Sequence, residues 1–309
     1  MPRRSLLALV AAGALASTGT AYVGARNLLV GQAIHTRSVI PKAWDVPPRA
    51  DGVYAPGGGP VQRWQRGTPV DLHLMVFGDS TATGYGCRNA DEVPGVLIAR
   101  GLAEQTGKRV RLSTKAIVGA TSKGLSGQVD AMFVAGPPPD AAVIMIGAND
   151  VTALNGVGAS ARRLGAAVRR LRSSGAVVVV GTCPDFGVIT VIPQPLRWLA
   201  RTRGLRLARA QAAAVQAAGG VPVPLADLLA PHFRRAPERL LSEDRYHPSA
   251  AGYALAADQL LPALCQALGQ PMGGLTSALR GRRRVGIVSR LWRRSTTGVP
   301  APVVAPAAG

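Results

Sequence analysis

Between residues 71 and 268, short apolar runs alternate with longer segments whose apolar residues recur every three or four positions. The short runs predict five strands, at Leu72–Phe77, Val110–Val118, Ala141–Ile146, Ala176–Val180 and Val221–Val223. The longer segments predict helices at Val93–Thr106, Ser126–Val134, Gly158–Ser173, Leu205–Ala218 and Ala250–Leu268. Strands that are apolar throughout and alternate with helices are typical of a parallel sheet covered on both faces. The pattern therefore predicts an α/β fold, a three-layer αβα sandwich with about five parallel strands.

The chain begins with the pattern of an export signal. A short positive start, Met1–Arg4, precedes an uncharged stretch over residues 5–25, whose most apolar part is Leu6–Ala16. Ala14–Ala16 offers a small-x-small cleavage site, and the uncharged stretch is also long enough to span a bilayer if it is not cut. We therefore expect residues 1–25 to be an export signal or an N-terminal anchor. The protein would then be secreted, or anchored to the outer face of the cytoplasmic membrane.

Three further segments complete the predicted organisation. Residues 26–69 contain Pro and Gly clusters without sustained periodicity and are expected to form a linker along the domain surface. Residues 70–269 hold the αβα domain. Residues 270–309 carry seven arginines and no acid, and they end in a Pro/Ala-rich stretch. We expect this tail either to contact an anionic membrane surface or to be a disordered, solubilising extension.

The composition is that of a basic globular protein. Hydrophobic residues make up 47% of the chain, which is enough for a sizeable core. The formal charge is +20, but no nucleic-acid-binding motif accompanies it, so we expect no nucleic-acid partner. The three cysteines, Cys87, Cys183 and Cys265, lack the spacing of a metal site and are too few for a disulfide framework. They are expected to be small buried hydrophobes, with a single disulfide as the alternative.

Polar residues follow the ends of the predicted strands, and in an open α/β sheet ligands bind beyond the carboxyl ends of the strands. The first strand runs into Gly78–Ser80. Ser80 would then begin the next segment at a helix N-terminus, where unpaired backbone amides favour negative charge. The alternative is that Ser80 is simply the cap of that helix.

Two more strands end on residues of interest. The second ends at Gly119, where the absence of a side chain lets the backbone approach a bound group, unless it is only a turn glycine. The third ends at Gly147–Asp150. Within that sequence, Asn149 offers a side-chain N–H donor at the open edge of the sheet, and Asp150 is expected to cap the following segment.

An acid and a histidine stand directly before the last predicted helix. Asp244 and His247 are three residues apart in one turn and can therefore lie within hydrogen-bonding reach. A carboxylate in that position fixes the imidazole tautomer and stabilises the imidazolium ion. A serine hydroxyl needs such a base to react at neutral pH. The alternative is an ion pair on the surface near a helix start.

The order of these features resembles the sequence blocks of SGNH hydrolases, also called GDSL lipases and esterases. The resemblance covers about Asp71–Leu268, two-thirds of the chain. The blocks that match closely are Gly78–Ser80, Gly147–Asp150 and Asp244–His247. The block around Gly119 is looser, because Ala116 and Val118 replace the polar residues usually found there.

This resemblance implies a flavodoxin-like sandwich and a serine esterase with the catalytic residues Ser80, Asp244 and His247. Ser80 would attack an ester carbonyl, His247 would carry its proton to the leaving alcohol, and Asp244 would orient His247. The oxyanion hole would consist of the backbone N–H groups of Ser80 and Gly119 and the side chain of Asn149. The resemblance implies no metal ion and no cofactor.

Other residues offer weaker alternatives. The sequence holds no Gly-x-Ser-x-Gly elbow, which argues against the other common serine-hydrolase architecture. Asp185 or Asp227 would be the alternative orienting carboxylate. Of the remaining histidines, His73 is expected in the first strand and His232 in a loop.

The ester itself is less defined by the sequence. The apolar segment Pro184–Arg203 would either line an acyl pocket over Ser80 or pack as a core loop. No insertion is large enough to form a lid, so we expect hydrolysis of small-molecule or lipid esters with short to medium acyl chains. We also expect the protein to be a monomer. An O-acetyl- or acyltransferase, or a deacetylase, acting on cell-envelope glycans with the same residues is the first alternative. A non-catalytic, membrane-associated binding module is the second.

Overall fold

The computed structural model describes residues 3–40, 46–134 and 136–269, and of residues 3–20 the backbone alone. The predicted tail, residues 270–309, lies outside the described residues. Six strands form one sheet in the order β1-β3-β2-β4-β5-β6. Their bounds are β1 Gly52–Tyr54, β2 Leu72–Gly78, β3 Val110–Thr114, β4 Ala141–Met145, β5 Val177–Gly181 and β6 Val221–Val223.

The sheet confirms the predicted parallel core and adds one strand to it. Strands β2 to β6 are parallel to their neighbours, whereas β1 pairs with β3 in the antiparallel direction. The segment 26–69 was expected to be a linker along the domain surface, and residues 52–54 within it form β1. A three-residue strand is too short to show an alternating pattern in the sequence, and it is held by its partner strand.

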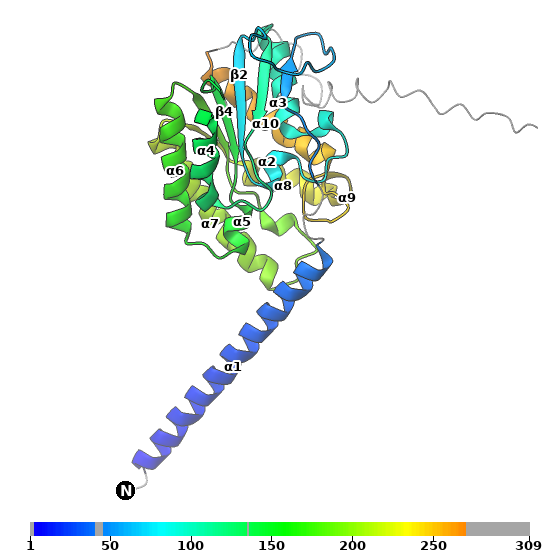
Figure 1. Ribbon diagram of the computed structural model, residues 1–309. Helices are drawn as coiled ribbons and strands as arrows, with labels where there is room; N and C mark the ends of the chain where they lie inside the picture. The colour runs from blue at the N-terminus through cyan, green and yellow to red at the C-terminus, as the bar shows by residue number, and fades with distance from the viewer. Residues whose placement is uncertain (1–2, 41–45, 135, 270–309) are drawn as a thin grey trace, which may run out of the picture.

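Helices cover both faces of the sheet (Figure 1). The long helices of the domain are α3 Pro94–Thr106, α4 Leu125–Val134, α6 Val157–Ser173, α7 Leu196–Ala217, α8 Leu225–Arg235 and α10 Ala250–Ala267. Short helices are α2 Ser80–Thr83, α5 Ala148–Thr152, α9 Pro237–Leu240, η1 Ala90–Glu92, η2 Ser122–Gly124 and η3 Phe186–Val188.

The core consists of one apolar layer on each face of the sheet, because successive side chains of a strand point to opposite faces. Leu74 and Val76 of β2 belong to the layer under α3 and α10. Met75 and Phe77 belong to the layer under α4 and α6. All four side chains are almost completely buried. This explains why β2 reads as a continuous apolar run in the sequence.

A long N-terminal helix, α1 (Arg3–Val39), extends away from the domain (Figure 1). Residues 26–39 of the expected linker are therefore helical. Among the residues whose side chains the structure describes, which leave out 3–20, no helix is long and apolar enough to cross a membrane. Two other helices differ from expectation: α7 begins nine residues earlier than predicted, and α8 occupies a region read as loop, so that His232 lies on a helix.

The end of β2 is shaped by Gly78, which has φ +135°. A Cβ atom built at this position would lie 1.9 Å from the carbonyl oxygen of Met145 on the neighbouring strand. The side-chain amide of Gln128 holds the same peptide unit by donating to the Gly78 carbonyl and accepting from the Gly78 N–H, both at 2.8 Å. The next residues, Asp79 and Ser80, are therefore set in position by a turn that only glycine can make.

We expect Gly78→Ala to lower the free energy of unfolding by at least about 2 kcal/mol, since it adds both backbone strain and a clash with a neighbouring strand. Urea denaturation measures the change. Gly57→Ala is the matched control, because Gly57 also has a positive φ, +86°, but has open space around the added atom. Equal losses of stability in the two variants would contradict the close approach at Gly78.

Candidate active site

Ser80 is the first residue of α2 and is buried, with 6% of its surface exposed. The cap of this helix is Asp79, whose side chain accepts a hydrogen bond from the Thr81 N–H at 3.0 Å. The alternative reading of Ser80 as the cap is therefore wrong. In the first turn of a helix the backbone N–H has no acceptor within the helix. Ser80 thus presents both a hydroxyl and an N–H group at the carboxyl end of β2.

His247 connects Ser80 to Asp244 through its two ring nitrogens. Nε2 of His247 lies 3.1 Å from Oγ of Ser80, across 167 positions of sequence. Nδ1 of His247 lies 2.6 Å from Oδ2 of Asp244. The side chains of His247 and Asp244 are only 10% and 9% exposed, so the Asp244–His247 pair is not a solvated surface ion pair.

The Asp244–His247 turn is closed by several bonds around one carboxylate. Oδ1 of Asp244 accepts from the Ser242 hydroxyl at 2.6 Å and from the backbone N–H groups of Tyr246 and His247 at 2.8 and 2.9 Å. The Ser242 N–H donates to the His247 carbonyl at 2.8 Å, which brings the two ends of the turn together. The ring of Tyr85 lies 4.6 Å from the imidazole, centroid to centroid, and limits its rotation.

These bonds decide the charge of Asp244. Burial alone would raise the pKa of its carboxyl, but the hydrogen bonds from His247, Ser242 and the backbone outweigh it and hold the pKa well below its usual range. The carboxylate is therefore ionised at neutral pH. An ionised carboxylate accepts from Nδ1–H, which leaves Nε2 as the nitrogen that can take a proton from Ser80.

Asn149 and Gly119 lie on adjacent segments at the carboxyl edge of the sheet. Asn149 is in α5, directly after β4, and its side-chain N–H donates to the Ala120 carbonyl at 3.0 Å. This bond ties α5 to the turn after β3, where Gly119 has φ +79°. Asn149 lines the cavity beside Ser80, whereas Gly119 is not among the described residues that line it.

Asp150 does not cap the following segment, contrary to expectation, because it lies inside α5 and is buried. Its carboxylate accepts from the N–H and hydroxyl of Ser122 at 2.8 and 2.7 Å, and from the hydroxyl of Ser160 at 2.7 Å. Asp150 therefore holds the loop after β3 against α5 and α6, and with it the position of Asn149.

Asp79, the residue before Ser80, was not singled out in the sequence. Its side chain is almost completely buried, and it accepts from the Thr81 N–H and, at 3.3 Å, from the Gly147 N–H. Burial raises the pKa of Asp79 to about 6, although these hydrogen bonds oppose the shift. The carboxyl joins the loop that carries Ser80 to the loop that carries Asn149.

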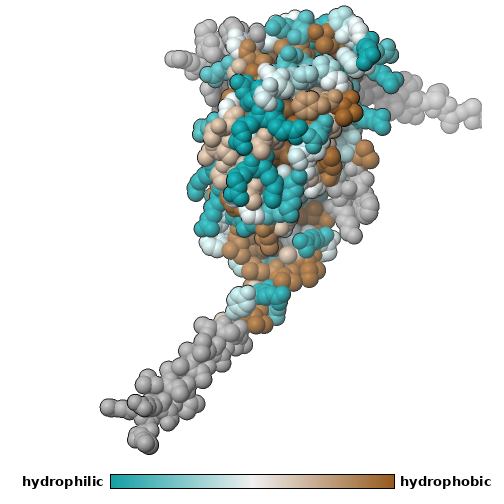
Figure 2. All heavy atoms as spheres, turned by 60° about the vertical axis from the view of Figure 1, so that its left-hand side comes forward, coloured by the Kyte–Doolittle hydropathy of each residue, from teal (hydrophilic) through white to brown (hydrophobic). Residues whose placement is uncertain are grey.

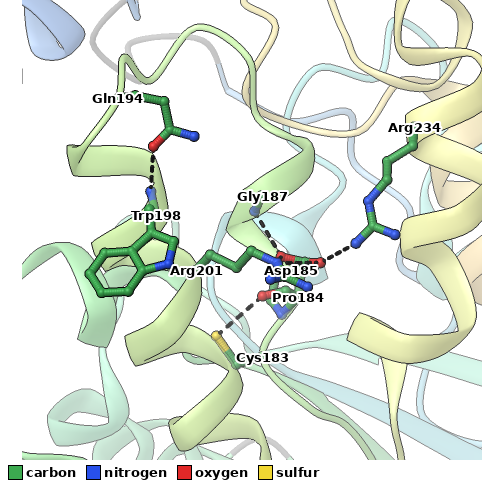
Figure 3. A network of polar contacts seen from close by, with 8 residues as sticks. All are labelled: Cys183, Pro184, Asp185, Gly187, Gln194, Trp198, Arg201 and Arg234. Carbon is green, nitrogen blue, oxygen red and sulfur yellow. Dashed lines mark hydrogen bonds and ion pairs between the residues drawn. The ribbon is translucent and has the colours of Figure 1, made fainter.

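The alternative orienting carboxylates lie elsewhere. Asp185 is buried and pairs with two arginines, with Nε of Arg201 at 3.0 Å and Nη2 of Arg234 at 2.8 Å (Figure 3). It also caps η3 by accepting from the Gly187 N–H at 2.8 Å. Asp227 is exposed in the first turn of α8. Asp185 therefore holds η3 against α7 and α8, and the carboxylate bonded to His247 is that of Asp244.

Other titratable groups take no part in this arrangement. His73 lies in β2, as expected, where Nε2 is 2.9 Å from the Ser113 hydroxyl, and His35 and His232 are exposed. All three cysteines are free and buried, as the sequence reading favoured, so the alternative of a disulfide is not realised. Within the described part of the chain, no group of three or more His, Cys, Asp or Glu residues is arranged to hold a metal ion.

An apolar cavity of about 90 Å³ opens beside Ser80 and His247. Its walls come from η3, α8 and α10 and include Phe186, Val188, Ile189, Leu229, Phe233 and Ala256. Only the first part of the segment 184–203, which was expected to line an acyl pocket or to pack as a core loop, lines this cavity. Further along the segment, Trp198 is 57% exposed. The contribution of α8 was missed because that helix was not predicted.

A buried serine is hydrogen-bonded to a histidine, and the histidine is hydrogen-bonded to an ionised aspartate. This arrangement is that of a serine hydrolase site. The model of the GDSL-like lipase/acylhydrolase family matches residues 76–255, and the chain belongs to this family, the SGNH hydrolases. The protein is accordingly a carboxylic ester hydrolase with the expected α/β sandwich fold.

One relative is similar over nearly the whole length. The chain is 71% identical to the GDSL-like esterase Rv1075c of Mycobacterium tuberculosis over 311 residues, which is 97% of this chain and 99% of the relative. Two solved structures share the fold at a TM-score of 0.50. They are the esterase EstA from Pseudoalteromonas sp. (19% identity, 64% of this chain and 100% of that one) and phospholipase A1 from Streptomyces albidoflavus (18% identity, 63% and 99%).

The raised pKa of Asp79 predicts a pH-dependent stability. The folded value of about 6 exceeds the ordinary 3.8, so folding favours the protonated form. This stabilisation is fully present below pH 3.8 and is lost as the pH rises through 6. Between these limits we expect the wild type to lose up to about 3 kcal/mol of unfolding free energy relative to Asp79→Asn. Urea denaturation at several pH values measures this, with the exposed Asp130→Asn as control. Parallel pH profiles for wild type and Asp79→Asn would refute it.

Proposed function

We propose that this esterase works through an acyl-enzyme formed on Ser80. Nε2 of His247 removes the proton of the Ser80 hydroxyl as its oxygen attacks the ester carbonyl. The same nitrogen then protonates the leaving alcohol, and in the second half of the reaction it activates the water that releases the acid. The observation that carries this proposal is the pair of contacts of His247, 3.1 Å to Ser80 and 2.6 Å to Asp244.

The same proposal assigns the oxyanion hole to the Ser80 N–H and the Asn149 side chain, with the Gly119 N–H as the third donor. The first two line the cavity in which the carbonyl would lie. Asn149 has two N–H bonds, and the one to Ala120 keeps its side chain in place while the other is available to the oxyanion. Donors fixed before the reaction stabilise the tetrahedral intermediate without reorganisation.

The apolar cavity supports short acyl chains as the preferred substrates. An apolar protein cavity of ~150 Å³ holds benzene, with six carbons, so 90 Å³ gives room for about three or four carbons. Acetyl to butyryl esters would bury their acyl chain there, with the carbonyl carbon at Ser80. Longer chains would need the walls formed by η3 and α8 to move apart.

We further propose that the enzyme is exported and held at the outer face of the cytoplasmic membrane by residues 1–25. The positive start followed by 21 uncharged residues supports this proposal. A helix of that length spans about 30 Å, which matches the hydrocarbon thickness of a bilayer. A secreted form would result if the segment were cleaved.

Replacement of Ser80 by Ala is expected to abolish hydrolysis of p-nitrophenyl butyrate and labelling by a fluorophosphonate probe, because no acyl-enzyme can form. Asn149→Ala is expected to lower kcat by about 10²–10³ while the probe still labels Ser80, because an oxyanion donor is lost. The exposed Asn89→Ala is the control and should keep full activity. Unchanged kcat in Ser80→Ala would exclude the proposed nucleophile.

The acyl cavity predicts a change in chain-length preference. Val188 lines the cavity, so Val188→Phe should lower kcat/KM for the butyrate ester by about tenfold relative to the acetate ester, because it fills the space for the longer chain. Val191→Phe is the matched control: Val191 lies in the same loop, half-buried, and does not line the cavity. If both variants change the ratio of kcat/KM for butyrate to kcat/KM for acetate equally, the acyl chain binds elsewhere.

A further inference from the structure

The C-terminal part of α1 is bound to the domain at the start of α7. The side chain of Gln32 makes both contacts: its amide N–H donates to the Gln194 carbonyl at 2.5 Å, and its oxygen accepts from the Leu196 N–H at 3.1 Å. These bonds join residues more than 160 positions apart in sequence. The direction in which α1 leaves the domain is therefore fixed by specific hydrogen bonds.

This junction lies at the active-site end of the sheet. Figure 1 shows α1 leaving the domain at the end where α2 and α5 follow the carboxyl ends of β2 and β4. Ser80 begins α2 and Asn149 lies in α5. If residues 1–25 are held in a membrane, the same end of the domain faces that membrane.

The surface around the junction is apolar and basic. Trp198 and Leu199, in the first turn of α7, are 57% and 38% exposed, and the Trp198 ring points away from the Asp185 cluster in Figure 3. On α1, Leu28 and Ile34 are more than half exposed. Figure 2 shows hydrophobic atoms gathered where α1 meets the domain. Arg26 and Arg37 of α1 are exposed and Arg197 of α7 is half-buried, and residues 21–39 and 196–200 contain no Asp or Glu.

We propose that this surface rests on an anionic phospholipid bilayer. We name it the junction face and define it by Leu28, Ile34, Trp198 and Leu199 with Arg26, Arg37 and Arg197. An exposed Trp beside arginines suits the bilayer interface, where an apolar ring meets water and anionic headgroups. A second copy of this chain fits less well, because two junction faces would place like charges together. The active site would then open toward esters held in the bilayer.

The proposal rests on the membrane anchoring proposed above, and a fluorescence experiment separates the two. The chain has four tryptophans, Trp44, Trp64, Trp198 and Trp292. One full-length variant keeps only Trp198, the others being replaced by Phe, and a second keeps only Trp64. Trp64 stacks on Arg111, near the amino end of β3, away from the active-site end. Each variant is reconstituted in phosphatidylglycerol/phosphatidylcholine vesicles whose acyl chains carry bromine.

We expect the bromolipids to quench Trp198 at least about twofold more strongly than Trp64, because only the junction face reaches the acyl chains. Equal quenching of the two tryptophans would overturn the proposal. Failure of the full chain to float with vesicles would refute the anchoring as well. If the protein floats with the vesicles but Trp198 is not quenched, the contact between the junction face and the bilayer is refuted and the anchoring is not. If Trp198 becomes shielded as the protein concentration rises without lipid, the junction face is covered by a second copy of the chain.

A kinetic comparison tests the same face through substrate access. Trp198→Ala should lower hydrolysis of a short-chain phospholipid ester held in anionic vesicles by about tenfold while leaving hydrolysis of soluble p-nitrophenyl acetate unchanged. Phe133→Ala is the matched control, because Phe133 is 55% exposed at the far end of α4, away from the carboxyl edge of the sheet. A loss on both substrates, or an equal loss in Phe133→Ala, would contradict a role at the bilayer.

Discussion

The active site depends on one carboxylate, that of Asp244, which is mostly buried and yet ionised. Asp244 can keep its charge out of water because three donors and the imidazole surround its two oxygens. Two of those donors are backbone N–H groups of the same turn, so the charge that orients His247 also stabilises the loop that carries it. Removal of the carboxylate would therefore leave the imidazole without a fixed tautomer and the turn without its central acceptor.

A second constraint acts at the other end of the histidine. Ser80 can reach Nε2 only because Gly78 lets the chain pass close to the Met145 carbonyl on the neighbouring strand. The Asp79 carboxylate then accepts a hydrogen bond from the Gly147 N–H, which joins the segments after β2 and β4. The Asp150 carboxylate accepts one from the Ser122 N–H in the loop after β3. The three loops at the carboxyl edge of the sheet thus hold one another through buried carboxylates. The positions of Ser80 and Asn149 follow from this network rather than from packing alone.

Much of this arrangement could be read from the sequence because its signals are local. Strands β2, β4 and β5 are nearly continuous apolar runs, and Asp244 and His247 share one turn. Two elements, β1 and α8, were not predicted from the sequence, the first because it has no local pattern and the second although it has one. Strand β1 has three residues and exists because β3 offers a free edge. Helix α8 does carry Leu225, Leu229 and Phe233 at four-residue spacing, which could have predicted a helix with one apolar face.

No local sequence pattern could predict the contacts between distant segments. The residues next to Asp79 in sequence do not predict that its carboxyl is buried, because its surroundings come from separate strands. The role of Asp150 was misjudged for the same reason. Its partners Ser122 and Ser160 come from two other segments, and only the folded chain brings them together. Local sequence therefore defined the chemistry, and long-range contacts defined the geometry.

The three buried thiols have a consequence for how this enzyme is made and where it can work. Burial raises the pKa of each, that of Cys87 to about 12, so almost none of the reactive thiolate exists at neutral pH. The fold needs no oxidant to mature and no disulfide isomerase to correct it. Its stability should be indifferent to glutathione or dithiothreitol. The same polypeptide can therefore fold equally well on the reducing and the oxidising side of a membrane.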